Sequence, residues 1–138
     1  MTPVETVEAF LHAYFGGDAA GTMELVADDF EWMSNGASER ATRGRDAMHT
    51  RVYEQNFGFP EDFSDGHHDT VYAMEDGDTV MHERVDHFTM RGTQINVACA
   101  ARFVVRDGRV AVWRDYFDMG DTVRQMVAAG VDLGGISG

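Results

Sequence analysis

The segment EDGDTVMHERVDHFTMRGTQINVACAARFVVRDGRVAVWRDYFD, residues 75–118, indicates the fold class. Its apolar and polar residues alternate over long runs, as in strands that bury one face. Asp-Gly pairs within EDGD and RDGR supply the positive φ angles that tight hairpin turns need. The sequence therefore predicts a meander of four antiparallel strands, over 69–75, 78–90, 93–106 and 109–118.

Helices are predicted before this meander. Thr2 is suited to be an N-cap, Pro3 to occupy the first helical position, and Glu5 to complete a capping box. The glycines of GGD at 16–18 end this helix. The other predicted elements are helices over 19–27, 44–57 and 121–131, a strand that enters a loop at 29–35, a loop over 57–68, and a flexible end at 131–138.

Helices followed by a run of strands indicate an α+β fold, with the sheet wrapped around or against the helices. The 138 residues, of which 43% are hydrophobic, fit one domain with one core. We find no repeat or linker, so residues 1–138 are expected to form a single domain.

Charge and composition argue against several classes of partner. The formal net charge of −13 would repel nucleic acid and an anionic membrane surface. No apolar run approaches the ~18 residues of a membrane span, and MTPVETVEAF does not resemble a secretion signal. The single cysteine, Cys99, suits a reducing compartment. We expect a cytoplasmic protein that binds neither nucleic acid nor membrane.

Alternation along the strands brings charged residues to an apolar-leaning face. In the run 78–90, Arg84 and Asp86 share a face with His82, and Asp115 shares a face with apolar residues of the last strand. An arginine fork can bind two carboxylates, and unequal surroundings let one acid keep its proton while the other is ionised. Two readings stay open from spacing alone: an acid–base site, or charges on a solvated strand face.

The motifs carry a resemblance that favours the first reading. ERVD at 83–86 and DGRVAVWRDYFD at 107–118, with GRDAM at 44–48, are similar to the limonene-1,2-epoxide hydrolase family. Its superfamily includes ketosteroid isomerases, scytalone dehydratase and polyketide cyclases. The resemblance implies a cystatin-like or nuclear transport factor 2-like cone, in which N-terminal helices pack in the concave face of a strongly curved, mostly antiparallel sheet.

The resemblance also implies a mechanism. Arg84 would hold both carboxylates, protonated Asp86 would donate to the epoxide oxygen, and Asp115 would take a proton from the attacking water. No metal or cofactor is required, because ring strain and protonation of the leaving oxygen provide the activation. The expected substrate is a small or medium apolar epoxide. The candidate pocket residues are Leu11, Tyr14, Phe88, Val97, Cys99 and Phe117, with His82 beside them.

One segment departs from the family pattern. The family positions its attacking water with a tyrosine and an asparagine two residues apart, where this chain has Trp32 and Ser34, with Asn35 one residue later. An indole N–H donates but cannot accept, whereas a hydroxyl does both. Asp115 with Ser34 or Asn35 remains a candidate to hold the water, and Trp32 is equally suited to be a stacking wall for a flat substrate.

Other readings remain beside hydrolysis. A cyclase or isomerase would use Asp115 or His82 as a base, and a ligand-binding module would use neither. His67, His68 and Asp69 do not predict a metal site, because adjacent side chains diverge and no third ligand lies at a plausible spacing. By analogy with the fold we expect a homodimer through outward residues of the sheet, namely Met81, Val85, Phe103 and Val105.

Overall fold

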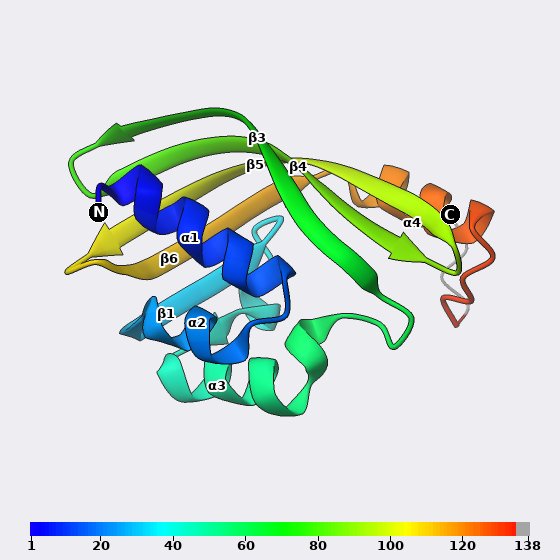
Figure 1. The fold of residues 1–138 in the computed structure, drawn as a ribbon, viewed down its shortest axis with the longest axis horizontal. Helices are drawn as coiled ribbons and strands as arrows, with labels where there is room; N and C mark the ends of the chain where they lie inside the picture. Colours follow the sequence, from blue (N-terminus) through cyan, green and yellow to red (C-terminus); the bar gives the residue numbers. More distant parts are fainter. Residues whose placement is uncertain (135–138) are drawn as a thin grey trace.

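A computed structural model describes residues 1–134 of the chain (Figure 1). These residues form four α-helices, two short 3-10 turns and six strands. In chain order they are α1 (Pro3–Phe15), α2 (Ala19–Glu24), β1 (Val26–Ser34), η1 (Ser38–Arg40), β2 (Thr42–Arg43), α3 (Arg45–Glu54), η2 (Asn56–Gly58), β3 (Ser64–Asp76), β4 (Thr79–Met90), β5 (Thr93–Arg106), β6 (Arg109–Phe117) and α4 (Met119–Ala128).

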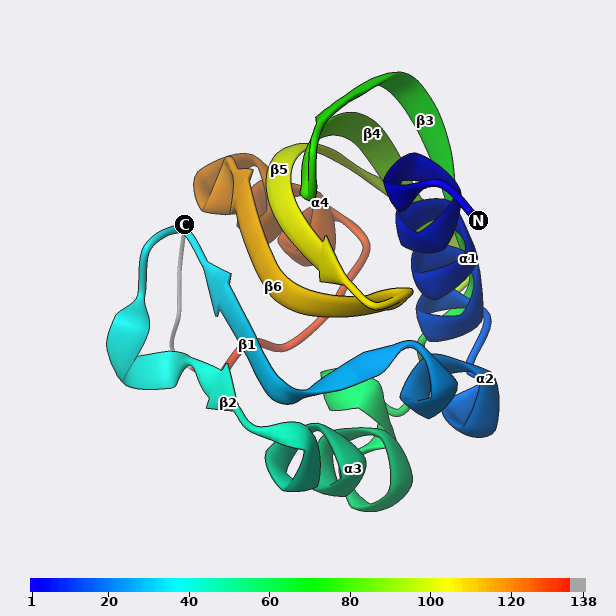
Figure 2. The ribbon, with the colours of Figure 1, turned by 90° about the vertical axis from the view of Figure 1, so that its left-hand side faces the viewer.

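The strands form one sheet in the order β2-β1-β6-β5-β4-β3. All neighbours are antiparallel except β1 and β6, which are parallel and bring Trp32 opposite Trp113 and Ser34 opposite Asp115. Figure 2 shows how strongly the sheet curves, with α1 on its concave side and α2 and α3 beside β1. The predicted α+β architecture and the meander of four long strands are confirmed.

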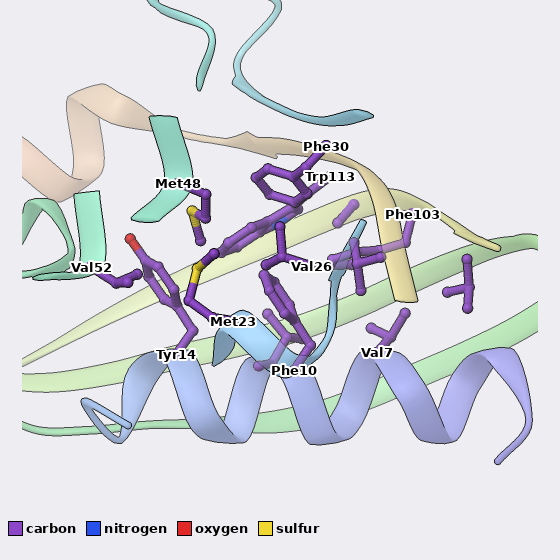
Figure 3. Packing of buried hydrophobic residues seen from close by; sticks show 14 of the residues in the cluster. Val7, Phe10, Tyr14, Met23, Val26, Phe30, Met48, Val52, Phe103 and Trp113 are labelled. Atoms are coloured by element: carbon purple, nitrogen blue, oxygen red, sulfur yellow. The ribbon is translucent and has the colours of Figure 1, made fainter. Parts of the chain in front are cut away.

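Helix α1 begins as its sequence predicts. The Thr2 hydroxyl accepts from the Glu5 backbone N–H at 3.1 Å, and the Glu5 carboxylate accepts from the Thr2 N–H at 2.8 Å. The helix buries Phe10 and Tyr14 against the sheet, where both rings pack edge-on against Trp113 (Figure 3). The predicted amphipathic helix therefore covers one side of the main core, to which Phe30, Met48 and Phe103 also belong.

Two predicted boundaries before the meander are wrong. The second helix ends at Glu24 instead of residue 27, because Val26 already pairs with Val110 of β6. The predicted loop over 57–68 ends earlier, since Ser64–His68 belong to β3 and pair with β4. The edge strand β3 is largely exposed, so this part lacks the apolar alternation by which a strand is recognised in sequence.

The third and last helices are also shorter or displaced. Helix α3 ends at Glu54, and the chain then turns through Phe57, whose φ of 61° is left-handed. Helix α4 begins at Met119 because Asp118 caps it, accepting from the Asp121 N–H at 3.0 Å. It ends at Ala128, three residues before the predicted end. Of the predicted flexible end, residues 135–138 lie outside the described part of the chain.

The outer sheet face differs from the expectation for a dimer. Met81 is 46% exposed and Val85 is half-buried, but Phe103 and Val105 lie in the core. The alternation of β5 points these two residues inward with Ile95, so they cannot be outward contacts, and pairing of two copies stays a prediction. Within residues 1–134, no helix is both long enough and apolar enough to cross a membrane.

Candidate active site

A buried arginine is the centre of the site. Arg84 projects from β4 to the concave side and is fully buried. Its Nε donates to Asp86 Oδ1 at 2.8 Å, and its Nη2 donates to Asp86 Oδ2 at 3.2 Å. The two residues are neighbours on one strand face, as the i, i+2 spacing predicts. Arg84 therefore binds Asp86 through two parallel hydrogen bonds.

The second carboxylate arrives from another strand. Asp115 of β6 accepts from Arg84 Nη1 at 3.1 Å and from Nη2 at 2.9 Å. It also accepts from the indole Nε1 of Trp113, two residues earlier on the same strand face, at 2.6 Å. The structure thus brings Arg84, Asp86 and Asp115 into direct contact, and Asp115 has one donor more than Asp86.

Burial and charge act on these groups in opposite directions. Burial lowers the pKa of Arg84, but the charges of Asp115 and Asp86 outweigh it, so the pKa is raised and the guanidinium stays charged. Burial raises the pKa of Asp86 above its ordinary value, although Arg84 acts against this rise. Asp86 is therefore the member of the pair with a tendency to retain a proton.

A cavity of about 210 Å³ opens onto both carboxylates. Four of the predicted pocket residues line it: Tyr14, Phe88, Val97 and Phe117. The remaining walls include Trp32, Trp113 and Met126, so the cavity is mainly apolar and aromatic. Such surroundings reduce the solvation of Asp86, which is the physical cause of its raised pKa.

Three predicted pocket residues do not line this cavity, which corrects the sequence reading. Leu11 is fully buried in the core beneath α1. Cys99 is buried as well, and burial raises the pKa of its thiol, so it is no nucleophile. His82 is held by Glu8 of α1 instead. All three lie on the expected inward faces, but alternation cannot distinguish core from cavity.

The loop after α3 supplies walls that the sequence analysis missed. Phe57, Phe59 and Phe63 line the cavity, and the Phe59 and Phe63 rings stack at 3.8 Å between centroids. Phe63 in turn packs on Phe88 at 5.0 Å. Three phenylalanines in FGFPEDF, 57–63, were the available signal, because aromatic residues in a loop need a surface to cover.

The three candidates for holding water are placed differently. Ser34 lines the cavity directly beside Asp115 in the strand register. Asn35 does not line it, and its side-chain oxygen accepts from the Phe117 N–H at 2.9 Å. Trp32 stacks on Trp113 at 4.0 Å, and its Nε1 is buried with no acceptor within residues 1–134. Trp32 is therefore a wall, and Ser34 is the candidate that remains beside Asp115.

Arg51, another residue that the sequence analysis missed, also lines the cavity. Its Nε donates to the Tyr14 hydroxyl at 3.1 Å, and the hydroxyl donates to the Phe57 carbonyl. Its guanidinium carbon lies 4.2 Å from the centre of the Trp32 ring. Arg51 thereby connects α3 with α1 and with the aromatic loop.

A separate cluster lies beneath α1. Glu8 contacts His82 Nε2 at 2.7 Å and His68 Nε2 at 2.8 Å, and it accepts from the Thr70 hydroxyl at 2.6 Å. The fold thus brings to His68 a third group that spacing did not reveal, and these atoms converge as metal ligands can. Three hydrogen bonds already satisfy the carboxylate, so the contacts are explained without an ion.

Comparisons with known proteins place this geometry in a family. The model of the limonene-1,2-epoxide hydrolase catalytic domain matches residues 1–128. Epoxide hydrolase EphG of Mycobacterium tuberculosis is 28% identical over 128 residues, which cover 92% of this chain and 80% of that protein.

Solved structures agree on the fold. An epoxide hydrolase of M. tuberculosis, described as LEH-like, has a TM-score of 0.77 at 25% identity and covers 92% of this chain and 90% of its own. A putative SnoaL-like polyketide cyclase from Shewanella putrefaciens has a TM-score of 0.76 at 11% identity, and the match covers 93% of this chain and 98% of that one. At this identity the likeness shows only that the fold is shared. The chain belongs to the limonene-1,2-epoxide hydrolase family.

Proposed function

We propose that this protein hydrolyses an epoxide to a vicinal diol in one step, with water as the nucleophile. The observation that carries the proposal is the unequal pair of carboxylates on Arg84. Asp86 is the acid, because burial raises its pKa. Asp115 is the base, because three N–H donors stabilise its ionised form.

The reaction balances on these two residues. Within residues 1–134, Asp115 Oδ2 accepts from Arg84 Nη2 alone, which leaves it a free lone pair for a proton of the attacking water. As the water oxygen bonds to an epoxide carbon, the ring C–O bond breaks and its oxygen takes the proton of Asp86. One proton enters Asp115 as another leaves Asp86, so a single proton transfer between them resets the pair.

The attacking water requires a second contact besides Asp115. Ser34 supplies it in this proposal, because its hydroxyl can donate and accept and it lies beside Asp115 across the β1–β6 pair. The asparagine that the family places here would reach farther than a serine. We therefore expect the water to sit closer to β1 than it would beside an asparagine.

The test is turnover of a panel of epoxides in oxygen-18 water, with Asp115→Asn alongside. Direct attack by water puts the label into the diol from the first single turnover. An ester intermediate on a protein carboxylate would instead give an unlabelled first product. Label in the first turnover, with loss of diol in Asp115→Asn, is expected; a folded protein that opens no epoxide would contradict the proposal.

A further inference from the structure

A side cavity, also of about 210 Å³, adjoins the main cavity at Arg51. It is lined by two arginines, two hydroxyl-bearing residues and one indole, namely Arg40, Arg51, Ser34, Thr42 and Trp32. Three of these residues also line the main cavity: Arg51, Ser34 and Trp32. No carboxylate is part of the side cavity's lining, although the chain holds 24 acidic residues against 11 basic ones.

The two arginines are not paired with acids. None of the ion pairs found within residues 1–134 includes Arg40 or Arg51. Arg51 uses its Nε for the Tyr14 hydroxyl, and its Nη nitrogens make no hydrogen bond within the described chain. Other unpaired arginines, such as Arg91 and Arg109, are exposed at hairpin turns where water hydrates them. Arg51 instead lies half-buried on a cavity wall.

The position of Arg51 is fixed by its surroundings. Trp113 stacks on one face of Trp32 at 4.0 Å, so the Arg51 guanidinium, 4.2 Å from the ring centre, must lie on the opposite face. A Cβ on Gly58 would come within 2.4 Å of Arg51 Nη2, so the glycine leaves room for the guanidinium. The arginine is thus preorganised, and ordering it costs a ligand little.

We propose that the substrate is an aryl epoxide that carries a carboxylate, and that Arg51 binds this carboxylate with Arg40 beside it. A planar guanidinium fork matches a carboxylate, and the stacked Phe59, Phe63 and Phe88 rings favour an aromatic group. The Trp32 indole lies between Arg51 and Trp113, whose Nε1 donates to Asp115. The aryl ring of the proposed substrate therefore has to span from Arg51 past this indole to Asp115.

This inference rests on the proposed epoxide hydrolysis for the reacting group, and the experiment separates the two. We would compare kcat/KM for 4-(oxiran-2-yl)benzoate with that for its neutral counterpart, 4-(oxiran-2-yl)benzamide. The wild type is expected to prefer the carboxylate by about tenfold or more. Arg51→Met should reduce this ratio about 10- to 100-fold, the size expected for charge-assisted hydrogen bonds.

Two further variants sharpen the test. Arg51→Lys keeps the charge but loses the fork, so it should recover only part of the preference. Arg91→Met removes an exposed arginine of the β4–β5 hairpin that lines neither cavity, and it should leave the ratio unchanged. Because the amide is measured in each variant, a general loss of activity cancels from the ratio. A wild-type ratio near one, with the amide hydrolysed, overturns the inference and leaves the hydrolase proposal standing.

If neither epoxide is opened, hydrolysis fails and binding still tests the anion site. Trp32 and Trp113, the two tryptophans of the chain, both line the cavity and report on occupancy by fluorescence. The quenching curves should give a lower Kd for 4-vinylbenzoate than for 4-vinylbenzamide. The affinity for 4-vinylbenzoate should weaken with added salt, and the difference between the two probes should disappear in Arg51→Met. Equal affinity for the two probes in the wild type would overturn the inference.

Discussion

Trp113 Nε1 donates a hydrogen bond of 2.6 Å to Asp115 Oδ1, the oxygen that Arg84 Nη1 also contacts. This contact distinguishes two carboxylates that otherwise share one guanidinium. Asp86 has no donor other than Arg84 within the described chain. In the proposed reaction, the extra N–H favours Asp115 as the base and Asp86 as the acid.

Removal of this N–H should lower activity, because Asp115 loses a donor that holds its ionised carboxylate in place. Trp113→Phe keeps an aromatic ring in the core but deprives the ionised carboxylate of a charge-assisted hydrogen bond, worth about 1.5–3 kcal/mol. We expect kcat/KM to fall about tenfold or more at neutral pH. Trp32→Phe is the matched control, because the Nε1 of Trp32 has no acceptor within residues 1–134, and an equal loss of kcat/KM in that variant would contradict this role.

Replacement of Asp86, the proposed acid, should change the alkaline limb of the pH–rate profile. The pKa of Asp86 is raised by burial, so the rate should decline at the pH where this carboxyl loses its proton. Asp86→Asn cannot donate that proton, and we expect kcat to fall about 10²- to 10⁴-fold with loss of the alkaline limb. A pH–rate profile of the variant that retains its alkaline limb would assign the acid to another group.

Arg84 should be essential to stability as well as to the site. Its replacement by Met leaves two nearly buried carboxylates without a positive charge beside them, which costs about 3–5 kcal/mol for a broken buried pair. Chemical denaturation should show this loss in the free energy of unfolding. The triple variant Arg84→Met, Asp86→Asn, Asp115→Asn removes all the charges and should recover part of it; no recovery would mean that packing, not charge, explains the loss.

The cluster under α1 predicts how stability depends on pH. Burial raises the pKa of Glu8, but hydrogen bonds from Thr70, His82 and His68 outweigh it and lower the pKa from 4.5 to about 2. The folded state thus binds this proton less readily than the unfolded chain. The contribution of Glu8 is fully present above pH 4.5 and is lost as the pH falls toward 2.

The matched variant for this effect is Glu8→Gln, which keeps the shape but does not titrate in this range. Wild type should be the more stable protein at pH 6, and the difference in free energy of unfolding should narrow between pH 4.5 and 2. Burial also lowers the pKa of His82, so wild type should lose further stability as the pH falls below 6.5. If the difference in free energy of unfolding between wild type and Glu8→Gln stays constant with pH, the role assigned to Glu8 is refuted.

The amino-acid sequence is enough to predict the order of elements, the alternation of the strands and the pairing of Arg84 with Asp86. These are local properties, since i, i+2 on a strand and the Asp-Gly turns act over a few residues. The ends of the elements are less well predicted from the sequence. Val26 fits the predicted helix over 19–27, but in the structure it pairs with Val110 of β6. The exposed edge strand β3 carries too little apolar alternation to be recognised at its start.

The packing of the whole chain sets which inward residues line the cavity and which fill the core. Leu11, Cys99 and His82 face inward like Phe88 and Phe117, but of these five only Phe88 and Phe117 line the cavity that opens onto the two carboxylates. The same is true of contacts between distant segments. Glu8 meets His68, and Arg51 meets Trp32, because strand order and helix packing bring them together, and no spacing along the chain encodes such distances.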